Sequence, residues 1–218
     1  ELVPNLNPDL EEAVKVPDCS IDPFRLCMLN MRTSELKGGL SFTRHKVTEI
    51  IQSHGRCIGV KATDAATGEA KEIHGNIIVN AAGAWTHLIA QLAGCEVPIT
   101  LSKGSLVITN HRLTDMVINR LRPSSDGDII VPNEAVCLAG TTSLAVHDPD
   151  KIPIEPAEVD IIIGEAGRMI PHFNHTRIIR AFSGVRPLLK SQKLDSREIS
   201  RGFQIIDHQN GLYSIVGG

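Results

Sequence analysis

The side chain best suited to bind an anion lies in the run 183–188, which reads Ser-Gly-Val-Arg-Pro-Leu. A guanidinium grips a phosphate or a carboxylate through two parallel hydrogen bonds, which few other side chains can do. Pro187 restricts the backbone of the residue before it, so Arg186 would be held in a preset direction. The alternative is a surface arginine paired with a carboxylate of the protein, and the residues alone favour that alternative.

Two hydroxyl groups and one ammonium group are further polar candidates. Thr141 and Thr142 follow Gly140 at the end of an apolar strand. Threonine is also favoured in strands simply because it packs well there, so a purely structural role stays open. Lys103 precedes a Gly-Ser turn, where it either supports a pocket or is solvated, and solvation is the safer interpretation.

The stretch 76–85, Asn-Ile-Ile-Val-Asn-Ala-Ala-Gly-Ala-Trp, could bring a ligand against bare backbone. Its β-branched residues 77–79 predict a short strand buried on both faces. Ala82 and Gly83 then remove almost all side-chain bulk, and Trp85, the only tryptophan, follows. In open α/β sheets, ligands bind beyond the carboxyl end of such a strand. The alternative is a tight strand-to-helix turn packed on its own helix, and the stretch alone leaves both open.

Histidine, cysteine and aspartate spacings predict neither a metal site nor a catalytic acid. His172 and His175 are close in sequence, but no nearby carboxylate or cysteine completes a set of metal ligands. Asp126 and Asp128 frame a glycine and are more typical of a turn. The five cysteines are odd in number and contain no Cys-x-x-Cys. They argue against a disulfide framework or a zinc site and favour a reduced, cytosolic setting.

Length and composition favour a soluble globular protein. The 218 residues can form one large domain or two modest ones. Hydrophobic residues make up 42% of the chain and charged residues 22%, with a net charge of -3. This balance and the 3% aromatic content argue against nucleic acid as a partner. No apolar run approaches the roughly 20 residues that span a bilayer.

The hydrophobic pattern of the first half predicts a helix followed by strands. Asp22-Pro23 predicts a helix start, because aspartate caps a helix and proline suits its first position. The helix runs to about Lys37 and carries an apolar stripe of Phe24, Cys27, Met28 and Met31. Residues 47–79 are typical of a β-meander that leads into the buried strand.

The second half predicts mostly strands, with a helix over residues 155–169 that covers an antiparallel sheet. The fold class that we expect is therefore mixed α/β (α+β). We expect residues 1–98 mainly in one α/β domain and residues 99–200 mainly in an antiparallel-sheet domain. Residues 201–218 would be strands that return to the first domain.

An ordered series of short motifs resembles FAD-dependent glycerol-3-phosphate dehydrogenases, which belong to the D-amino-acid-oxidase-like superfamily. Each motif is short, and the resemblance depends on their order along essentially the whole chain. It is closest to the flavin subunit of the anaerobic type, through residues 103–106 and 117–120. The other motifs lie at residues 22–26, 79–85, 128–132, 140–143, 183–188, 200–202 and 216–218.

The resemblance implies a fold, a reaction and a location. The first and last segments would form part of an FAD-binding domain with its β-meander, and the middle segment would form the substrate (cap) domain. The enzyme would oxidise glycerol 3-phosphate to dihydroxyacetone phosphate and pass the electrons through FAD to a quinone. The resemblance also implies a cytoplasmic protein, and it leaves room for peripheral attachment to the inner face of the cell membrane and for other dehydrogenase subunits as partners.

The resemblance assigns site residues as well. Two arginines would anchor the substrate phosphate, although Arg201 can equally sit on an exposed turn, and the two threonines would face the substrate pocket near the flavin. The substrate-binding candidates are Arg186, Arg201, Thr141, Thr142 and Lys103. The candidates that line the flavin are Ala82, Gly83 and Trp85.

Three departures from the family pattern leave the catalytic base unassigned and the cofactor site incomplete. The aerobic, single-subunit enzymes carry a histidine at the place of Leu106, and the lysine that follows the family's Gly-Gly is absent after Gly218. A Gly-x-Gly-x-x-Gly turn, which admits a pyrophosphate, does not occur in the sequence. We therefore expect an excised fragment that is inactive alone and does not hold FAD tightly by itself.

Two other functions stay open at this point. The first is an FAD-dependent amino-acid or 2-hydroxy-acid oxidase or dehydrogenase of the same superfamily, because an arginine holds a carboxylate as readily as a phosphate. The second is a non-catalytic docking module without a cofactor.

Overall fold

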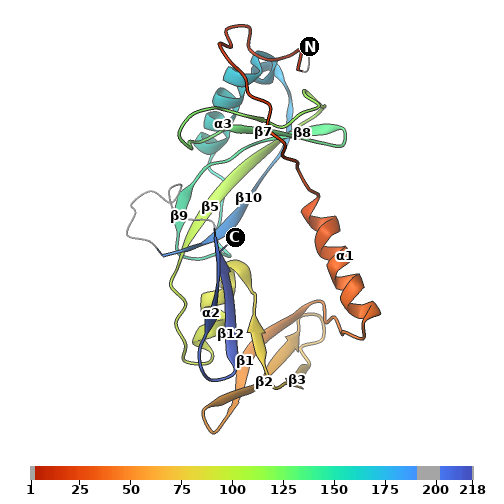
Figure 1. The fold of residues 1–218 in the computed structure, drawn as a ribbon, viewed down its shortest axis with the longest axis vertical. Coiled ribbons are helices and arrows are strands. Elements are labelled where there is room, and N and C mark those ends of the chain that lie inside the picture. Colours follow the sequence, from red (N-terminus) through yellow and green to blue (C-terminus); the bar gives the residue numbers. More distant parts are fainter. Residues whose placement is uncertain (1–2, 191–201, 218) are drawn as a thin grey trace. The chain divides into compact units, whose positions relative to one another are not determined.

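The computed structural model describes residues 3–190 and 202–217 (Figure 1). The chain divides into two compact units, each built from two stretches of sequence. The first unit contains Glu1–Ser20 and Thr100–Arg201, and the second contains Ile21–Ile99 and Gly202–Gly218. Each unit is therefore assembled from segments that lie far apart in the sequence.

A six-stranded sheet forms the framework of the first unit. Its strand order is β10-β5-β8-β7-β6, and β9 pairs with β5 beside this path. The pairs of β5 with β8, β5 with β9, β6 with β7 and β7 with β8 are all antiparallel, as expected for the middle of the chain. The strands are β5 (Ile99–Thr109), β6 (Ile118–Asn119), β7 (Ile129–Asn133), β8 (Val136–Gly140), β9 (Leu144–Val146) and β10 (Ile178–Leu189).

Helix α3 (Pro156–Met169) packs against β8 and closes the core of the first unit, which confirms the expected covering helix (Figure 1). Pro156 occupies the start of the helix, where its missing N–H has no intrahelical partner to lose. Ile162 and Ala166 are fully buried on one face of the helix, as a period of 3.6 residues requires. The short 3-10 helix η2 (Pro171–His175) follows and places Phe173 in the same core.

The second unit holds two three-stranded sheets. Strands β1 (His45–Ser53), β2 (Arg56–Asp64) and β3 (Ala70–His74) form an antiparallel meander, which confirms that prediction. In the other sheet β12 (Leu212–Gly217) lies between β11 (Phe203–Asp207) and β4 (Ile78–Asn80). The β12 strand runs antiparallel to β11 and parallel to β4. One apolar cluster contains residues from both sheets, namely Ile50, Cys57 and Leu212.

Strand β4 is only partly buried, so the prediction of a strand buried on both faces is wrong for the described residues. Ile77 and Val79 are 61% and 57% exposed. Ile78 and Asn80, which alternate with them, point to the opposite face, where Ile78 packs against the apolar cluster and Asn80 is buried. A continuous apolar run therefore indicated a strand correctly but did not indicate how many of its faces are covered.

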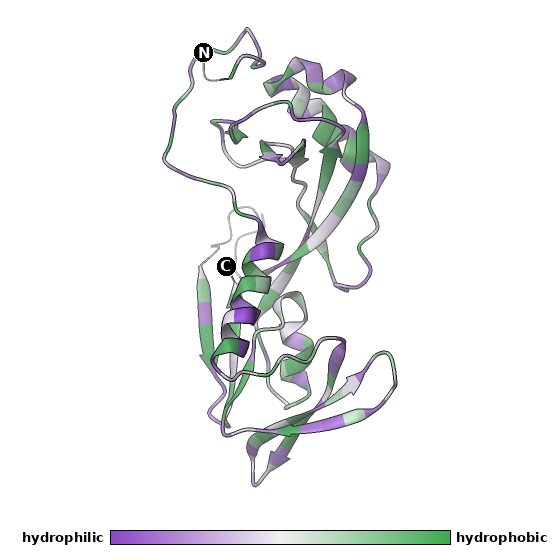
Figure 2. Ribbon diagram, turned by 90° about the vertical axis from the view of Figure 1, so that its right-hand side faces the viewer, coloured by the Kyte–Doolittle hydropathy of each residue, from purple (hydrophilic) through white to green (hydrophobic). Residues whose placement is uncertain are grey.

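Helix α1 (Pro23–Leu36) begins at the predicted cap and ends at the predicted place. The Asp22 carboxylate accepts a hydrogen bond from the N–H of Arg25 at 3.1 Å. Figure 2 shows hydrophobic and hydrophilic residues interspersed along this helix. The predicted apolar stripe is not part of a core, because Phe24 is 81% exposed and no residue of the helix is buried. Of the helices in the described residues, none combines the length and apolarity that crossing a bilayer requires.

Replacement of Phe173 by alanine should lower the free energy of unfolding of the first unit by about 3–5 kcal/mol, because it leaves a cavity in a closed core. The control is Leu121→Ala, which truncates an apolar side chain that is 84% exposed in the same unit and should change that free energy by less than about 0.5 kcal/mol. Urea unfolding of the isolated chain, followed by circular dichroism, measures both values. Equal effects of the two substitutions would contradict the placement of Phe173 in the core.

Candidate functional site

The guanidinium of Arg186 is held by the segment that connects β8 to β9. Its Nη2 donates to the hydroxyl Oγ1 of Thr141 at 2.7 Å, and its Nη1 donates to the carbonyl oxygen of Thr142 at 3.3 Å. Arg186 lies on β10 and is half-buried. The structure therefore brings together three residues that the sequence proposed for the same role, although 44 or more positions separate the threonines from the arginine.

The guanidinium also lies against the backbone of β5 at Gly104. A Cβ atom at position 104 would overlap the guanidinium of Arg186. Glycine is thus required here for a close approach of a side chain to a main chain. The prediction of a Gly-Ser turn after Lys103 is wrong, because Gly104 and Ser105 lie inside β5.

Lys103 is buried on the opposite face of β5, so the expectation that it is solvated is wrong. Alternation along a strand points Lys103 and Ser105 away from the face on which Gly104 meets the guanidinium. Lys103 is 4% exposed, and its Nζ donates to Glu158 Oε2 and to the carbonyl oxygen of Pro153, both at 2.6 Å. Its ammonium group is therefore bound within the protein.

The carboxylate of Glu158 is the centre of a buried polar network, called here the Glu158 network, which also contains Lys103, Ser105 and Thr142. Its Oε1 accepts from the hydroxyls of Ser105 and Thr142, each at 2.8 Å. Its Oε2 accepts from Lys103 at 2.6 Å and from the N–H of Glu155 at 3.0 Å. A buried carboxylate with this many donors is fully satisfied.

Burial by itself would raise the pKa of Glu158, because it penalises the charged form. The hydrogen bonds from Lys103, the Glu155 N–H, Thr142 and Ser105 favour the charged form and outweigh the burial. Together they hold the pKa of Glu158 at about 2. Glu158 is therefore ionised at neutral pH and forms a true ion pair with Lys103.

Thr142 links the Glu158 network to Arg186. Its hydroxyl accepts from the N–H of Ser105 at 2.9 Å and donates to Glu158, while its carbonyl accepts from Arg186. The hydroxyl is buried and has partners on both sides. Its contacts are therefore structural, whereas the Thr141 hydroxyl lies beside the guanidinium.

Glu158 was not predicted as a site residue, although the sequence contains a signal for it. Glu158 lies four residues before Ile162 and eight before Ala166, so it shares the apolar face of a predicted helix. A carboxylate on such a face predicts a buried partner. Arg201, the second arginine proposed for the substrate, lies outside the described residues.

In the second unit, the proposed flavin-lining residues form the turn that follows β4. Gly83 has a φ of +57°, which favours glycine, and no atom lies within 4 Å of the place where a Cβ would stand. Gly83 to Trp85 form the 3-10 helix η1 (Gly83–Trp85), and the Trp85 ring is partly exposed. The turn therefore leaves main chain open to a flat ring or a phosphate, and it fits a contact with part of an FAD molecule.

The buried side chain of Asn80 holds this turn in place through hydrogen bonds. Its Nδ2 donates to the carbonyl oxygen of Thr86 at 2.9 Å and to the Ser214 hydroxyl at 3.2 Å, and its Oδ1 accepts from the N–H of Ala82 at 3.4 Å. Ser214 is in turn hydrogen-bonded to His208 at 2.9 Å. Asn80 was not among the predicted site residues. It holds the backbone of the turn from Ala82 to Thr86.

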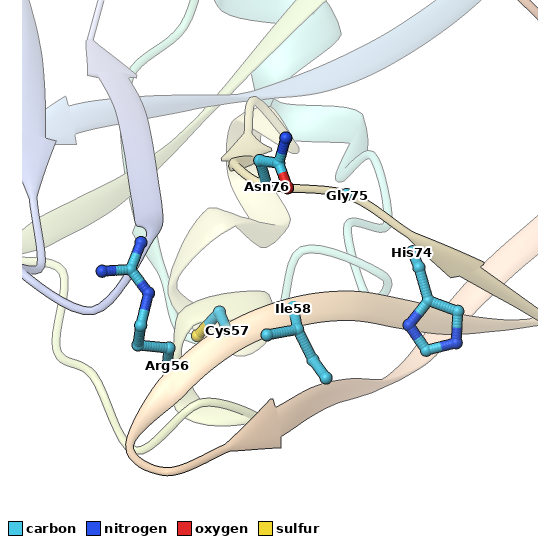
Figure 3. Close-up of a pocket in the computed structure, with 6 residues that line it drawn as sticks. All are labelled: Arg56, Cys57, Ile58, His74, Gly75 and Asn76. Carbon is cyan, nitrogen blue, oxygen red and sulfur yellow. The ribbon is translucent and has the colours of Figure 1, made fainter.

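A separate hollow in the second unit contains none of the predicted site residues. Figure 3 shows that Arg56, Cys57 and Ile58 of β2 and His74 of β3 line it. Burial, with a smaller effect of nearby Cys95, raises the pKa of Cys57, so its thiol is a poor nucleophile. Among the described residues, no three His, Cys, Asp or Glu side chains are grouped to hold a metal ion. The hollow is therefore a weaker candidate than the Arg186 site.

Comparisons with known proteins identify the family. The model of the FAD dependent oxidoreductase family (DAO) matches residues 1–218. One subunit of the anaerobic glycerol-3-phosphate dehydrogenase of Escherichia coli (strain K12) is 41% identical over 99% of this chain and 41% of that protein. Its counterpart from Haloferax volcanii is 39% identical over 100% of this chain and 40% of that protein. The chain thus spans about 40% of the length of these relatives.

Solved structures share the fold. The glycerol-3-phosphate dehydrogenase of Bacillus halodurans, complexed with FAD, matches 89% of this chain and 38% of its own, with a TM-score of 0.73 and 25% identity. The L-proline dehydrogenase of P. horikoshii matches 90% of this chain and 50% of its own, with a TM-score of 0.73 and 18% identity. At 18% identity the second likeness concerns the fold alone.

The first unit should lose stability as the pH falls from about 4.5 towards about 2, because Glu158 has a folded pKa of about 2 against an ordinary value of 4.5. The unfolded chain binds the proton first, so the contribution of Glu158 is complete above pH 4.5 and disappears as the pH falls through 2. Its size is on the order of 3 kcal/mol. Urea midpoints measured across this range give the pH dependence.

The control for this measurement is Glu158→Gln, which has no ionisation at position 158. Its free energy of unfolding should be lower at neutral pH and should change less across the same pH range. An unchanged pH dependence in this variant would show that other carboxylates cause it.

Proposed function

Because the chain belongs to the family of FAD-dependent oxidoreductases, we propose that it is part of a glycerol-3-phosphate dehydrogenase that oxidises glycerol 3-phosphate to dihydroxyacetone phosphate. The observation that carries this proposal is the identity of 39–41% over essentially the whole chain to proteins named as subunits of anaerobic glycerol-3-phosphate dehydrogenases. Because the chain spans about 40% of those relatives, the activity is proposed for the whole protein that contains it.

In this proposal Arg186 binds the phosphate of the substrate. The guanidinium is fixed by Thr141, by the carbonyl of Thr142 and by its position on Gly104. A guanidinium whose direction is set before binding loses little freedom when it grips a phosphate, and this preorganisation favours binding. Arg201 is proposed as a second phosphate ligand on the basis of the sequence resemblance.

The turn after β4 is proposed as a contact for FAD. When bound, FAD supplies the ring that accepts a hydride. The chain's own part is to present main chain with almost no side-chain bulk at Ala82 and Gly83, next to Trp85. Asn80 keeps this turn in place through its three hydrogen bonds.

The electron acceptor, partners and location are proposed from the family resemblance. The acceptor is a quinone, and the protein is cytoplasmic with peripheral attachment to the inner face of the cell membrane. The relatives are named as one subunit of their enzyme, which supports a proposal that other subunits join the whole protein. Reduction of a soluble quinone analogue by the purified enzyme tests the acceptor directly.

Replacement of Arg186 by alanine in the full-length enzyme should raise the KM for glycerol 3-phosphate roughly 100-fold, because two charge-assisted hydrogen bonds to the phosphate are lost. The bound flavin, measured by its absorbance, should stay in place. The matched control is Arg180→Ala, which removes an exposed arginine from the same strand. An unchanged KM in the Arg186 variant would reject Arg186 as the phosphate ligand. Activity of the parent enzyme on carboxylated substrates in place of glycerol 3-phosphate would reject the proposed substrate.

Replacement of Gly104 by alanine should raise the same KM roughly 10- to 100-fold, because the new methyl group displaces the guanidinium of Arg186. The fold should survive, since the displaced atoms are the end of a flexible side chain. Gly164→Ala on α3 is the control, because nothing lies within 4 Å of its Cβ position. Steady-state kinetics should therefore give a higher KM for Gly104→Ala than for Gly164→Ala. Equal KM values in the two variants would contradict the contact between Gly104 and Arg186.

A further inference from the structure

We infer that Glu158 is a positioning residue for Arg186, acting through Thr142 from the opposite face of β5. This inference deepens the proposed function and depends on Arg186 as the phosphate ligand. The path has two steps, from the Glu158 carboxylate to the Thr142 hydroxyl at 2.8 Å, and from the Thr142 carbonyl to Arg186 at 3.3 Å.

The first step is rigid because every group in it has a defined partner. The hydroxyl of Thr142 has one hydrogen to donate, and Glu158 accepts it. The same oxygen accepts the N–H of Ser105 on β5 at 2.9 Å. A hydroxyl that is fixed on both sides cannot rotate without breaking a buried hydrogen bond, which is costly where water cannot replace it.

The second step connects the side chain of Thr142 with Arg186 through the carbonyl group of Thr142 itself. With the hydroxyl fixed, the backbone of Thr142 is fixed relative to β5 and α3. Its carbonyl then meets Nη1 of Arg186, while the neighbouring Thr141 hydroxyl meets Nη2. Two adjacent residues therefore orient the two ends of one guanidinium, and the anchor of both is the Glu158 network.

Neither Glu158 nor Lys103 is placed to touch a substrate, since each is about 4% exposed. The role inferred for Glu158 is therefore positioning and not catalysis. The competing explanation is that the ion pair only ties α3 to the sheet. That explanation predicts a loss of stability on substitution but no selective effect on binding of the phosphate.

The experiment uses the full-length, FAD-loaded enzyme and a double-mutant cycle with Arg186. Thr142→Val removes the hydroxyl and leaves the ion pair intact, whereas Thr142→Ser keeps the hydroxyl and is the conservative control. The charge-neutral pair Lys103→Met with Glu158→Gln removes the ionic centre without leaving one charge buried alone. KM and kcat for glycerol 3-phosphate are measured for each variant, alone and combined with Arg186→Ala.

If Glu158 acts through Arg186, Thr142→Val and the charge-neutral pair each raise KM about tenfold with a smaller change in kcat, and Thr142→Ser stays near the parent enzyme. Both increases should disappear in the Arg186→Ala background. An unchanged KM in flavin-loaded variants, or the same increase with and without Arg186, would overturn the inference. If the charge-neutral pair does not fold, the two Thr142 variants decide alone. An unchanged KM in Arg186→Ala itself would reject Arg186 as the phosphate ligand and with it the premise of this inference, whereas a parent enzyme without activity on glycerol 3-phosphate would reject the proposed function.

Discussion

The buried ion pair between Lys103 and Glu158 is the interaction on which the first unit depends. Taking two charges out of water is expensive, and their attraction repays it only when further hydrogen bonds satisfy both groups. Glu158 accepts four hydrogen bonds, one of them from Lys103, and Lys103 donates a second to the carbonyl of Pro153, so both charged groups are hydrogen-bonded within the protein. Loss of one partner would leave the other charge buried alone, at a cost of about 3–5 kcal/mol. The pair thereby fixes α3, β5 and the segment after β8 in one arrangement.

The two candidate contacts use the same construction in different units. In the first, a buried carboxylate holds Thr142, whose carbonyl orients the half-buried Arg186. In the second, the buried amide of Asn80 holds the backbone from Ala82 to Thr86, and the exposed Gly83 lies within that turn. In both places a buried polar residue holds the residue that is proposed to face a ligand. Supporting residues of this kind restrict the directions that a proposed contact residue can adopt.

Local sequence patterns predicted the helices and strands of this chain well, but they predicted poorly which residues are buried. Asp22-Pro23 indicated the start of α1, and the apolar periodicity after residue 155 indicated α3, because caps and periodicity act over a few residues. The burial of Lys103 depends on β8, β9 and α3, which lie 33 to 66 positions further along the chain. The residues next to Lys103 therefore do not indicate that it is buried. The exposure of Val79 has the same origin, since an apolar run does not say what covers it. Arg186 was proposed from its motif, but only the fold shows what holds it.

Helix α1 exposes apolar side chains to water. Side chains such as Phe24 and Met28, 81% and 70% exposed, form an apolar surface on a helix that buries none of its own residues. Burial of such apolar surfaces against one another lowers the free energy. Preparations of the 218-residue chain should therefore associate as they are concentrated, and their apparent molecular mass should depend on dilution. Purification at low concentration is the practical consequence.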